Sequence, residues 1–307
     1  MIILSNIIYR AHGRDKCNLP IFSLPFRQSF PFKMPAITNA PSAAQPGSAS
    51  RSLENLPGHW VLARMGKRVL RPGGMGLTRR LLAALDIGPA DDVVEFAPGL
   101  GATARLALAK KPASYTAVER DGAAAETVRR LLAGGVQRCI VGNAEATGLP
   151  AARASVVYGE AMLTMHAPAQ KAAIAREAFR VLRPGGRYGI HEIALTPDTV
   201  DEATKRDILQ SLSHSIRVGA RPQTLAEWKA LFENAGFRVK TIHTAPLHLL
   251  EPRRLIQDEG FFRALKFVFN VMRTPEARRR VRGMRGVFRK YAGHLSAVMM
   301  VLEKPAG

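Results

Sequence analysis

Cysteine is scarce in this chain: Cys17 and Cys139 are the only two among 307 residues. Two cysteines exclude the disulfide framework of a small secreted domain and a zinc-finger site. No apolar run reaches the roughly 18 residues that indicate a membrane-spanning helix. The apolar run within residues 1–9 lacks a basic region before it and a small-residue cleavage site after it, so we expect no secretory signal. We expect a cytoplasmic protein without a metal site.

Acidic residues are also few, at 24 against 45 lysines and arginines, which gives a formal net charge of +21. Such a balance favours an anionic partner, such as nucleic acid, membrane or an acidic ligand, but says little about the fold. Hydrophobic residues make up 47% and charged residues 22% of the chain. This composition is ordinary for a globular protein and excludes a disordered or collagen-like chain.

The positive charge is concentrated in two segments. Residues 1–50 hold five basic residues and one acidic residue, and from Met34 they are rich in Pro, Ser and Ala. This composition predicts disorder; it resembles a transit peptide, but we interpret 1–50 as a disordered or start-site extension, with Met34 as a candidate start. Residues 251–292 hold twelve basic and four acidic residues. We expect 51–307 to be one domain that contains 251–292 as a basic helical insert.

Short apolar runs alternate with helical patterns between residues 76 and 193. We expect strands at 93–96, 115–118, 139–141, 155–158 and 188–193, with helices at 77–85, 102–110, 122–133 and 169–182. This alternation predicts βαβ units and a parallel sheet. Thr224 and Glu227 form a capping box that predicts a helix over 225–235. Residues 237–244 and 295–302 are expected to add two strands.

The most informative segment is the first expected strand with its glycine-bearing turn, which reads Glu95-Phe96-Ala97-Pro98-Gly99-Leu100-Gly101. Small residues let the backbone approach a ligand closely, and the next helix N-terminus offers free N–H groups. Glu119 ends the second strand, where a carboxylate can bind both ribose hydroxyls. Asn143, after the third strand, is placed to bind an adenine edge. All three loops lie at the carboxyl ends of parallel strands, where open α/β sheets bind ligands.

These motifs resemble those of the class I S-adenosylmethionine-dependent methyltransferases, over roughly residues 76–304. The likeness also includes Leu182–Gly186, which reads Leu-Arg-Pro-Gly-Gly. It implies an α/β fold with a doubly wound, mostly parallel, seven-stranded, Rossmann-like sheet and a helical insert before the last strand. It further implies S-adenosyl-L-methionine as cofactor, bound by Glu95, Ala97, Gly99, Gly101, Glu119, Asn143 and Ala144.

Two residues depart from the family pattern. Ala97 stands at the first glycine position, and alanine adopts only negative φ at low cost, so we expect the turn to differ slightly. Asn143 replaces the usual Asp, so the adenine contact loses its charge. Both changes leave a vestigial cofactor site open as an alternative. A dinucleotide dehydrogenase is the near competitor, since its fingerprint tolerates an alanine at Ala104, but the unchanged Leu182–Gly186 favours the methyltransferase.

Two residues are candidates for catalysis. The family's methyl donor is already a strong electrophile, so the protein mainly has to hold acceptor and methyl in line for displacement. Glu160 follows the fourth strand, in the loop that faces the methyl group in this fold. The equal alternative is a loop carboxylate paired with an arginine. His191 lies in the fifth strand and is a candidate general base, or a hydrogen-bonded strand histidine. Neighbours on a strand point to opposite faces, so at most one of His191 and Glu192 should face the site.

The acceptor is expected to be a small, partly apolar organic molecule. Enzymes that methylate base amines usually carry an Asn/Asp-Pro-Pro-aromatic motif where this chain reads Gly159-Glu160-Ala161-Met162. This difference argues against a nucleic-acid partner, although a nucleic-acid methyltransferase stays as one alternative. A non-enzymatic cofactor-binding protein is the other. The sequence does not indicate an oligomeric state.

The basic insert allows three interpretations. It holds an apolar segment at 261–272, followed by a strongly basic one at 278–290. Such a pair can pack on the sheet edge with a solvated charged face, cover an apolar acceptor as a lid, or make peripheral contact with a membrane through 251–292.

Overall fold

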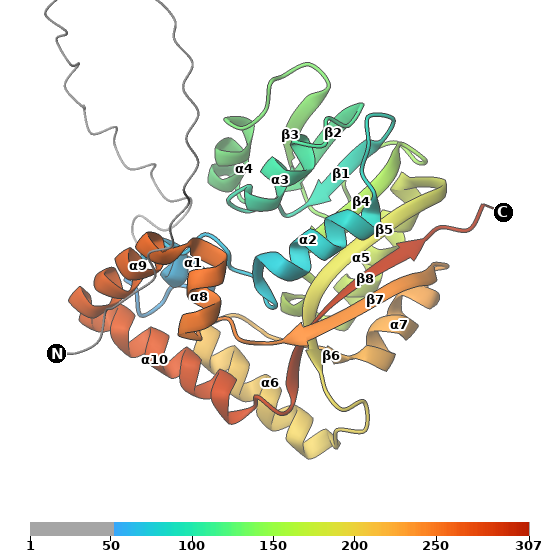
Figure 1. Ribbon diagram of the computed structural model, residues 1–307. Helices are drawn as coiled ribbons and strands as arrows, with labels where there is room; N and C mark the ends of the chain where they lie inside the picture. The colour runs from blue at the N-terminus through green and yellow to red at the C-terminus, as the bar shows by residue number, and fades with distance from the viewer. Residues whose placement is uncertain (1–51, 307) are drawn as a thin grey trace, which may run out of the picture. The chain divides into compact units, whose positions relative to one another are not determined.

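The computed structural model describes residues 52–306, so the interpretation of 1–50 and of Met34 lies outside the described residues. A sheet with the order β3-β2-β1-β4-β5-β8-β7 forms the centre, and β6 pairs with β5 beside this path (Figure 1). The strands are β1 (Asp92–Phe96), β2 (Ser114–Glu119), β3 (Gln137–Val141), β4 (Ala154–Glu160), β5 (Leu182–Leu195), β6 (Gln223–Thr224), β7 (Arg238–Pro246) and β8 (Leu295–Glu303). The predicted doubly wound, seven-stranded sheet is confirmed, with the short β6 as an addition.

The direction of the strands brings the sequence motifs together. β1 to β5 pair in parallel, and β8 runs antiparallel between β5 and β7. The carboxyl ends of β1, β2 and β4 are Phe96, Glu119 and Glu160. Because parallel strands end at one edge of a sheet, the loops that follow these residues lie next to each other.

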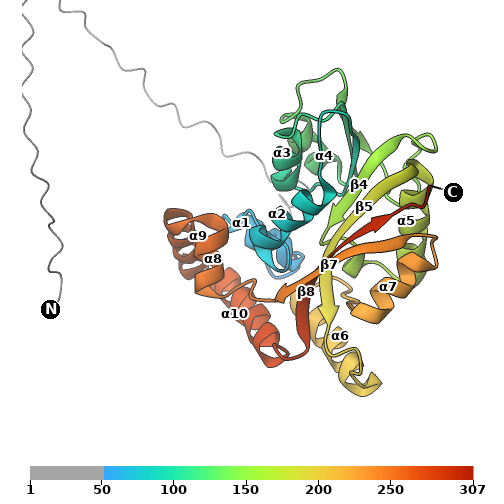
Figure 2. The same ribbon diagram turned by 45° about the vertical axis from the view of Figure 1, so that its right-hand side comes forward.

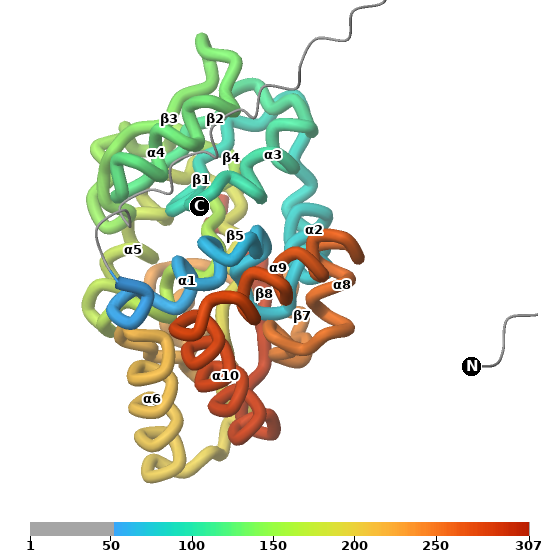
Figure 3. Tube along the Cα trace, turned by 90° about the vertical axis from the view of Figure 1, so that its left-hand side faces the viewer, coloured from blue at the N-terminus to red at the C-terminus, as the bar shows by residue number. Residues whose placement is uncertain are grey.

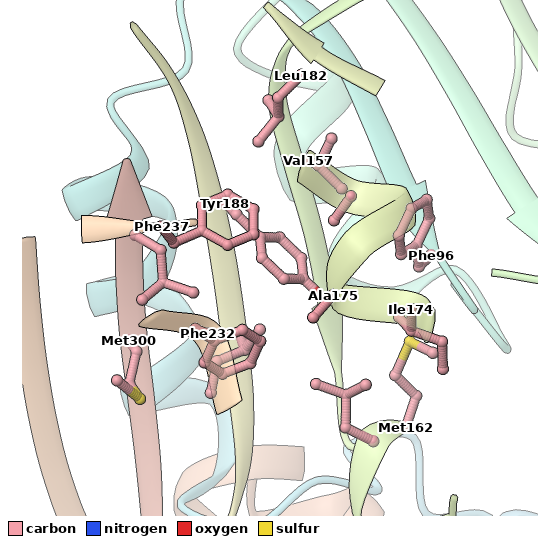
Figure 4. Packing of buried hydrophobic residues seen from close by; sticks show 14 of the residues in the cluster. Phe96, Val157, Met162, Ile174, Ala175, Leu182, Tyr188, Phe232, Phe237 and Met300 are labelled. Atoms are coloured by element: carbon pink, nitrogen blue, oxygen red, sulfur yellow. The ribbon is translucent and has the colours of Figure 1, made fainter. Parts of the chain in front are cut away.

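Helices cover both faces of the sheet. α2 (Gly74–Leu85), α3 (Ala102–Leu108) and α4 (Gly122–Arg129) pack on one face, and α5 (Pro168–Val181) and α7 (Leu225–Glu233) pack on the other. Side chains alternate along each strand, so Phe96 faces α5 and α7 while Val93 faces α2 and α3. Figure 4 shows the α5 and α7 layer, in which the ring of Tyr188 packs against Phe232 and Phe237.

The predicted elements agree with the observed ones, with two main differences. The capping box of α7 is confirmed: Thr224 Oγ1 accepts from Glu227 N at 3.2 Å, and Glu227 Oε2 accepts from Thr224 N at 2.8 Å. The helix expected over 122–133 ends at Arg129. The helix expected over 169–182 ends at Val181, and the segment Leu182–Gly186 begins β5, because Leu182 pairs with Ala154 ahead of a bulge in β5.

The remaining helices form a group beside the sheet. The insert between β7 and β8 is confirmed and consists of α8 (Pro252–Glu259), α9 (Phe261–Arg273) and α10 (Pro275–Lys290), which lie away from α5 and α7 (Figure 2). The sequence interpretation missed α1 (Gly58–Arg64), the 3-10 turn Leu163–Met165 and α6 (Glu202–Ile216). α1, α6 and α10 lie side by side (Figure 3). In the described part of the chain, no helix is long and apolar enough to cross a membrane.

Candidate active site

A cavity of about 700 Å³ lies where the strand ends meet. Six of the nine predicted site residues line it: Ala97, Gly99, Glu119, Asn143, Ala144 and Glu160. The other three, Glu95, Gly101 and His191, are not among its lining residues. Within residues 52–306 no group of three or more His, Cys, Asp or Glu side chains is arranged to hold a metal ion.

The turn after β1 has the backbone of a glycine turn despite its alanine. Ala97 has a φ of +50° and Gly99 a φ of +57°, so the expectation of a different turn at Ala97 is wrong. The N–H of Ala97 donates to the carbonyl of Val118 at 2.8 Å, which attaches the start of the turn to β2. A Cβ added to Gly99 would meet no atom within 4 Å, so the backbone of this residue borders open space.

Glu119 links the ends of β1 and β2. Its Oε2 accepts from Gly99 N at 3.0 Å, and its Oε1 accepts from Asp121 N at 3.0 Å. The side chain is nearly buried, yet it lines the cavity. A carboxylate has about four acceptor positions, so Glu119 keeps capacity for a ligand after these two bonds.

Glu95 lies among buried tyrosines and is not one of the residues that line the cavity. It is 3% exposed, and its Oε2 accepts from the hydroxyl of Tyr158 at 2.6 Å and from that of Tyr115. Burial raises the pKa of Glu95 to about 7 although both tyrosines stabilise the ionised form. This carboxyl is therefore part of the buried core behind the turn and does not line the cavity.

Gly101 is required by packing. It precedes α3 with a φ of +71°, and a Cβ added there would clash with Leu131. The left-handed backbone and the close approach of Leu131 both favour glycine. This residue shapes the turn without lining the cavity.

Glu160, the last residue of β4, is held by four groups. Its Oε1 accepts from Thr78 Oγ1 at 2.7 Å and lies 2.7 Å from Nδ1 of His191. Its Oε2 accepts from the hydroxyl of Thr103 and lies 3.2 Å from Nη1 of Arg71. Burial by itself would raise the pKa of Glu160, but Arg71 and His191 outweigh this effect and hold the pKa at about 2. The carboxylate is therefore ionised at neutral pH, and it is paired with an arginine as the alternative interpretation expected.

His191 is fully buried, and both of its ring nitrogens have partners. Nδ1 faces the carboxylate of Glu160, and Nε2 faces the carbonyl oxygen of Pro72. Both ring nitrogens are thus within hydrogen-bond distance of a protein oxygen, so neither is free to contact an acceptor molecule. This geometry is that of a hydrogen-bonded strand histidine, which orients Glu160.

Glu192 reaches the cavity from the other face of β5. Its carboxylate accepts hydrogen bonds at 2.7–3.1 Å from the three consecutive backbone N–H groups of residues 162–164. It lines the cavity while its neighbour His191 does not, as expected from side-chain alternation. Glu192 thereby holds the loop that follows Glu160.

The other part of the cavity has a mostly apolar wall. α1 contributes Trp60 and Leu62, α6 contributes Ile216, and α10 contributes Met284 and Phe288. Sequence reasoning missed Trp60, since one aromatic residue in a short helix forms no pattern. Met284 and Phe288 belong to the insert. The interpretation of the insert as a lid over the acceptor implied that some of its residues would line the cavity.

The insert is also attached to the segment before α2. Glu259 Oε1, at the end of α8, accepts from the backbone N–H groups of Arg68 and Val69 at 2.7 and 2.8 Å. Asp258 Oδ1 accepts from Met75 N at 2.9 Å. These bonds hold the strip that carries Arg68 and Arg71, both of which line the cavity.

Two sequence comparisons agree with this geometry. Residues 93–186 match the model of a family described as a methyltransferase domain. A protein of Haemophilus influenzae described as uncharacterized is 38% identical over 222 residues, which cover 70% of this chain and 86% of that protein.

Solved structures share the fold. The putative sarcosine dimethylglycine methyltransferase from Galdieria sulphuraria matches with a TM-score of 0.60 and 15% identity, over 75% of this chain and 85% of that one. Haemonchus contortus phosphoethanolamine N-methyltransferase 2, solved with S-adenosyl-L-methionine, matches with a TM-score of 0.62 and 14% identity, over 81% and 57% of the two chains. Residues 93–186 thus form a methyltransferase domain, and the chain has the fold of the S-adenosylmethionine-dependent methyltransferases.

Proposed function

We propose that this protein is a cytoplasmic enzyme that transfers a methyl group from S-adenosylmethionine to a small, partly apolar organic acceptor. The observation that carries the proposal is the composition of the cavity. Loops at the strand ends form one part, and apolar side chains of α1, α6 and α10 form the other. An apolar wall with a few polar groups is typical of a small-molecule site.

We assign the cofactor to the part of the cavity formed by the strand-end loops. The open space beside Gly99 allows close approach to the backbone, and Glu119 has acceptor capacity for the ribose hydroxyls. Ala97 and Ala144 add small side chains, and Asn143 would bind the adenine edge. These residues fit the cofactor in size and in hydrogen-bonding capacity.

We assign to Glu160 the orientation of the acceptor or the stabilisation of the sulfonium charge. When bound, S-adenosylmethionine supplies a methyl group that is already activated, so holding the partners in line provides most of the rate. Glu160 is an ionised carboxylate that lines the cavity and is fixed by Thr78, Thr103 and Arg71. His191 then acts as a positioning residue for Glu160.

The test is a transfer assay with tritiated S-adenosylmethionine and a cell extract that contains both low-molecular-weight compounds and nucleic acids. We expect label in a small organic product together with release of S-adenosylhomocysteine. Trp60→Ala combined with Phe288→Ala should raise KM for the acceptor and leave the Kd for the cofactor unchanged. Phe269→Ala, which removes an exposed aromatic side chain on α9, is the matched control.

Three results would contradict the proposal. Label found in RNA or DNA and not in a small molecule would favour the nucleic-acid alternative. Cofactor binding without any transfer would favour a vestigial protein. Unchanged acceptor kinetics in the Trp60 and Phe288 variant would place the acceptor elsewhere.

A further inference from the structure

Six large apolar side chains on α9 are exposed to solvent. Their exposed fractions are 60% for Phe261, 83% for Phe262, 58% for Leu265, 46% for Val268, 55% for Phe269 and 52% for Met272. On a helix with 100° per residue, these positions fall within an arc of about 120°. We call these six residues the α9 patch.

The fold uses a different face of the same helix. Ala264, Phe267 and Val271 are buried in a cluster that also contains Leu62 and Met284. The inner face of α9 thus packs on side chains that line the cavity. The outer face has no such partner within residues 52–306, since its side chains remain exposed.

The α9 patch is the main concentration of exposed apolar side chains in the described residues. Only three other large apolar side chains there are similarly exposed, namely Ile256 on α8 and Val136 and Val141 around β3. Single exposed apolar residues are normal, but a contiguous face of this kind marks a contact surface.

The charges on α9 indicate which kind of partner the α9 patch contacts. The helix carries Arg263, Lys266 and Arg273 and no acidic residue. Lys266 and Arg273 are exposed and border the α9 patch, and the guanidinium of Arg273 lies 5.3 Å from the ring centre of Phe269. Arg263 lies 3.8 Å from the carboxylate of Glu259, which is buried. α10 follows with seven basic residues and the single acidic residue Glu276.

We propose that α9 docks on an anionic lipid bilayer and lies in the plane of its interface, with the α9 patch inserted and Lys266 and Arg273 at the headgroups. With 13 residues the helix is too short to cross a bilayer, and an apolar face bordered by basic residues is suited to an interface. A second copy of this chain on the same face would bring two basic helices together without acidic partners. Anionic headgroups provide the complementary charge.

Vesicle flotation of the full chain tests this contact. The vesicles are phosphatidylcholine alone or phosphatidylcholine mixed with phosphatidylserine. We expect the wild type to float with the anionic vesicles and much less with the neutral ones. Phe262→Glu combined with Phe269→Glu should lower the floated fraction at least about tenfold, because burying one such side chain is worth about 1.5–3 kcal/mol. Val136→Glu, at an exposed apolar residue before β3, should float like the wild type.

Charge-reversal variants separate the electrostatic contribution to vesicle binding from the apolar contribution. Lys266→Glu combined with Arg273→Glu should abolish the preference for anionic vesicles, and added salt should weaken wild-type binding in the same way. Circular dichroism and cofactor calorimetry of every variant show that the fold and the cofactor site are retained. A failure of the membrane contact is thereby distinguished from a failure of the proposed enzyme function.

Three outcomes would overturn the proposal. The first is a wild type that does not float with anionic vesicles, and the second is a Phe262 and Phe269 variant that floats as well as the wild type. The third is a dimer in sedimentation velocity that this variant dissociates, without any vesicle binding, which would make the α9 patch an interface between copies.

Discussion

Nδ1 of His191 lies 2.7 Å from Oε1 of Glu160, and the two side chains are 0% and 6% exposed. The two residues are register partners, with Glu160 at the end of β4 and His191 within β5. In a catalytic triad, a carboxylate beside a histidine orients the ring as a general base. Here the second ring nitrogen faces the carbonyl of Pro72, so the pair instead makes a fixed and ionised carboxylate at the cavity.

Glu160→Gln should remove an acid-sensitive part of the stability. The pKa of Glu160 is about 2 in the folded protein, below its usual 4.5. The ionised group therefore stabilises the fold above pH 4.5, and this contribution is lost as the pH falls from 4.5 towards 2. We expect the loss to be on the order of 3 kcal/mol, measured by urea unfolding at several pH values. Glu126→Gln, at an exposed carboxylate on α4, is the control. An acid dependence of Glu160→Gln equal to that of the wild type would contradict this account.

Glu95→Gln should change the stability with a pH dependence opposite to that of Glu160→Gln. The folded protein keeps the proton of Glu95 up to a pKa of about 7, while the unfolded chain ionises above 4.5. Stability therefore falls as the pH rises between these two values. The variant should exceed the wild type by about 2–3 kcal/mol above neutral pH and match it in acid.

Calorimetry provides the second measurement on Glu95→Gln. Because the side chain lies outside the cavity, we expect an unchanged Kd for S-adenosylmethionine. A large loss of affinity would restore the direct cofactor contact that the family resemblance implied.

Ala97→Gly should stabilise the protein. A left-handed backbone costs alanine about 1–2 kcal/mol, and glycine gives back about 0.5–1 kcal/mol in backbone entropy. We expect a net gain of up to about 1 kcal/mol in the free energy of unfolding. Ala152→Gly, at a φ of +53° and outside the lining residues of the cavity, should give a similar gain. Only Ala97→Gly should also lower the Kd for the cofactor, and a loss of stability in that variant would show that the turn is unstrained.

Glu119→Ala should weaken cofactor binding by about 10- to 100-fold, because hydrogen bonds to a charged group are worth about 1.5–3 kcal/mol. Isothermal titration calorimetry with S-adenosylmethionine measures the change. Glu126→Ala on α4 removes an exposed carboxylate and should leave the affinity unchanged. Equal affinities for both variants would mean that the ribose is bound elsewhere.

The sheet and the strand-end loops could be predicted because short, local sequence patterns specify them. Apolar runs, glycine turns and the Thr224 capping box each specify one element. The order of the motifs then places Ala97, Glu119 and Asn143 at one edge of a parallel sheet. The left-handed φ of Ala97 was not predictable from residue preference, because alanine by itself favours a negative φ.

Only the tertiary structure decided what surrounds the predicted residues. Thr103 and Thr78 are 57 and 82 residues from Glu160 along the chain, and Pro72 is 119 residues from His191. Periodicity reports on one element at a time, so no pattern connects such partners. Periodicity also fails to predict which side of α9 is exposed, because apolar residues occur around most of the helix. Packing against Leu62 and Met284 determines which of them are buried and which form the α9 patch.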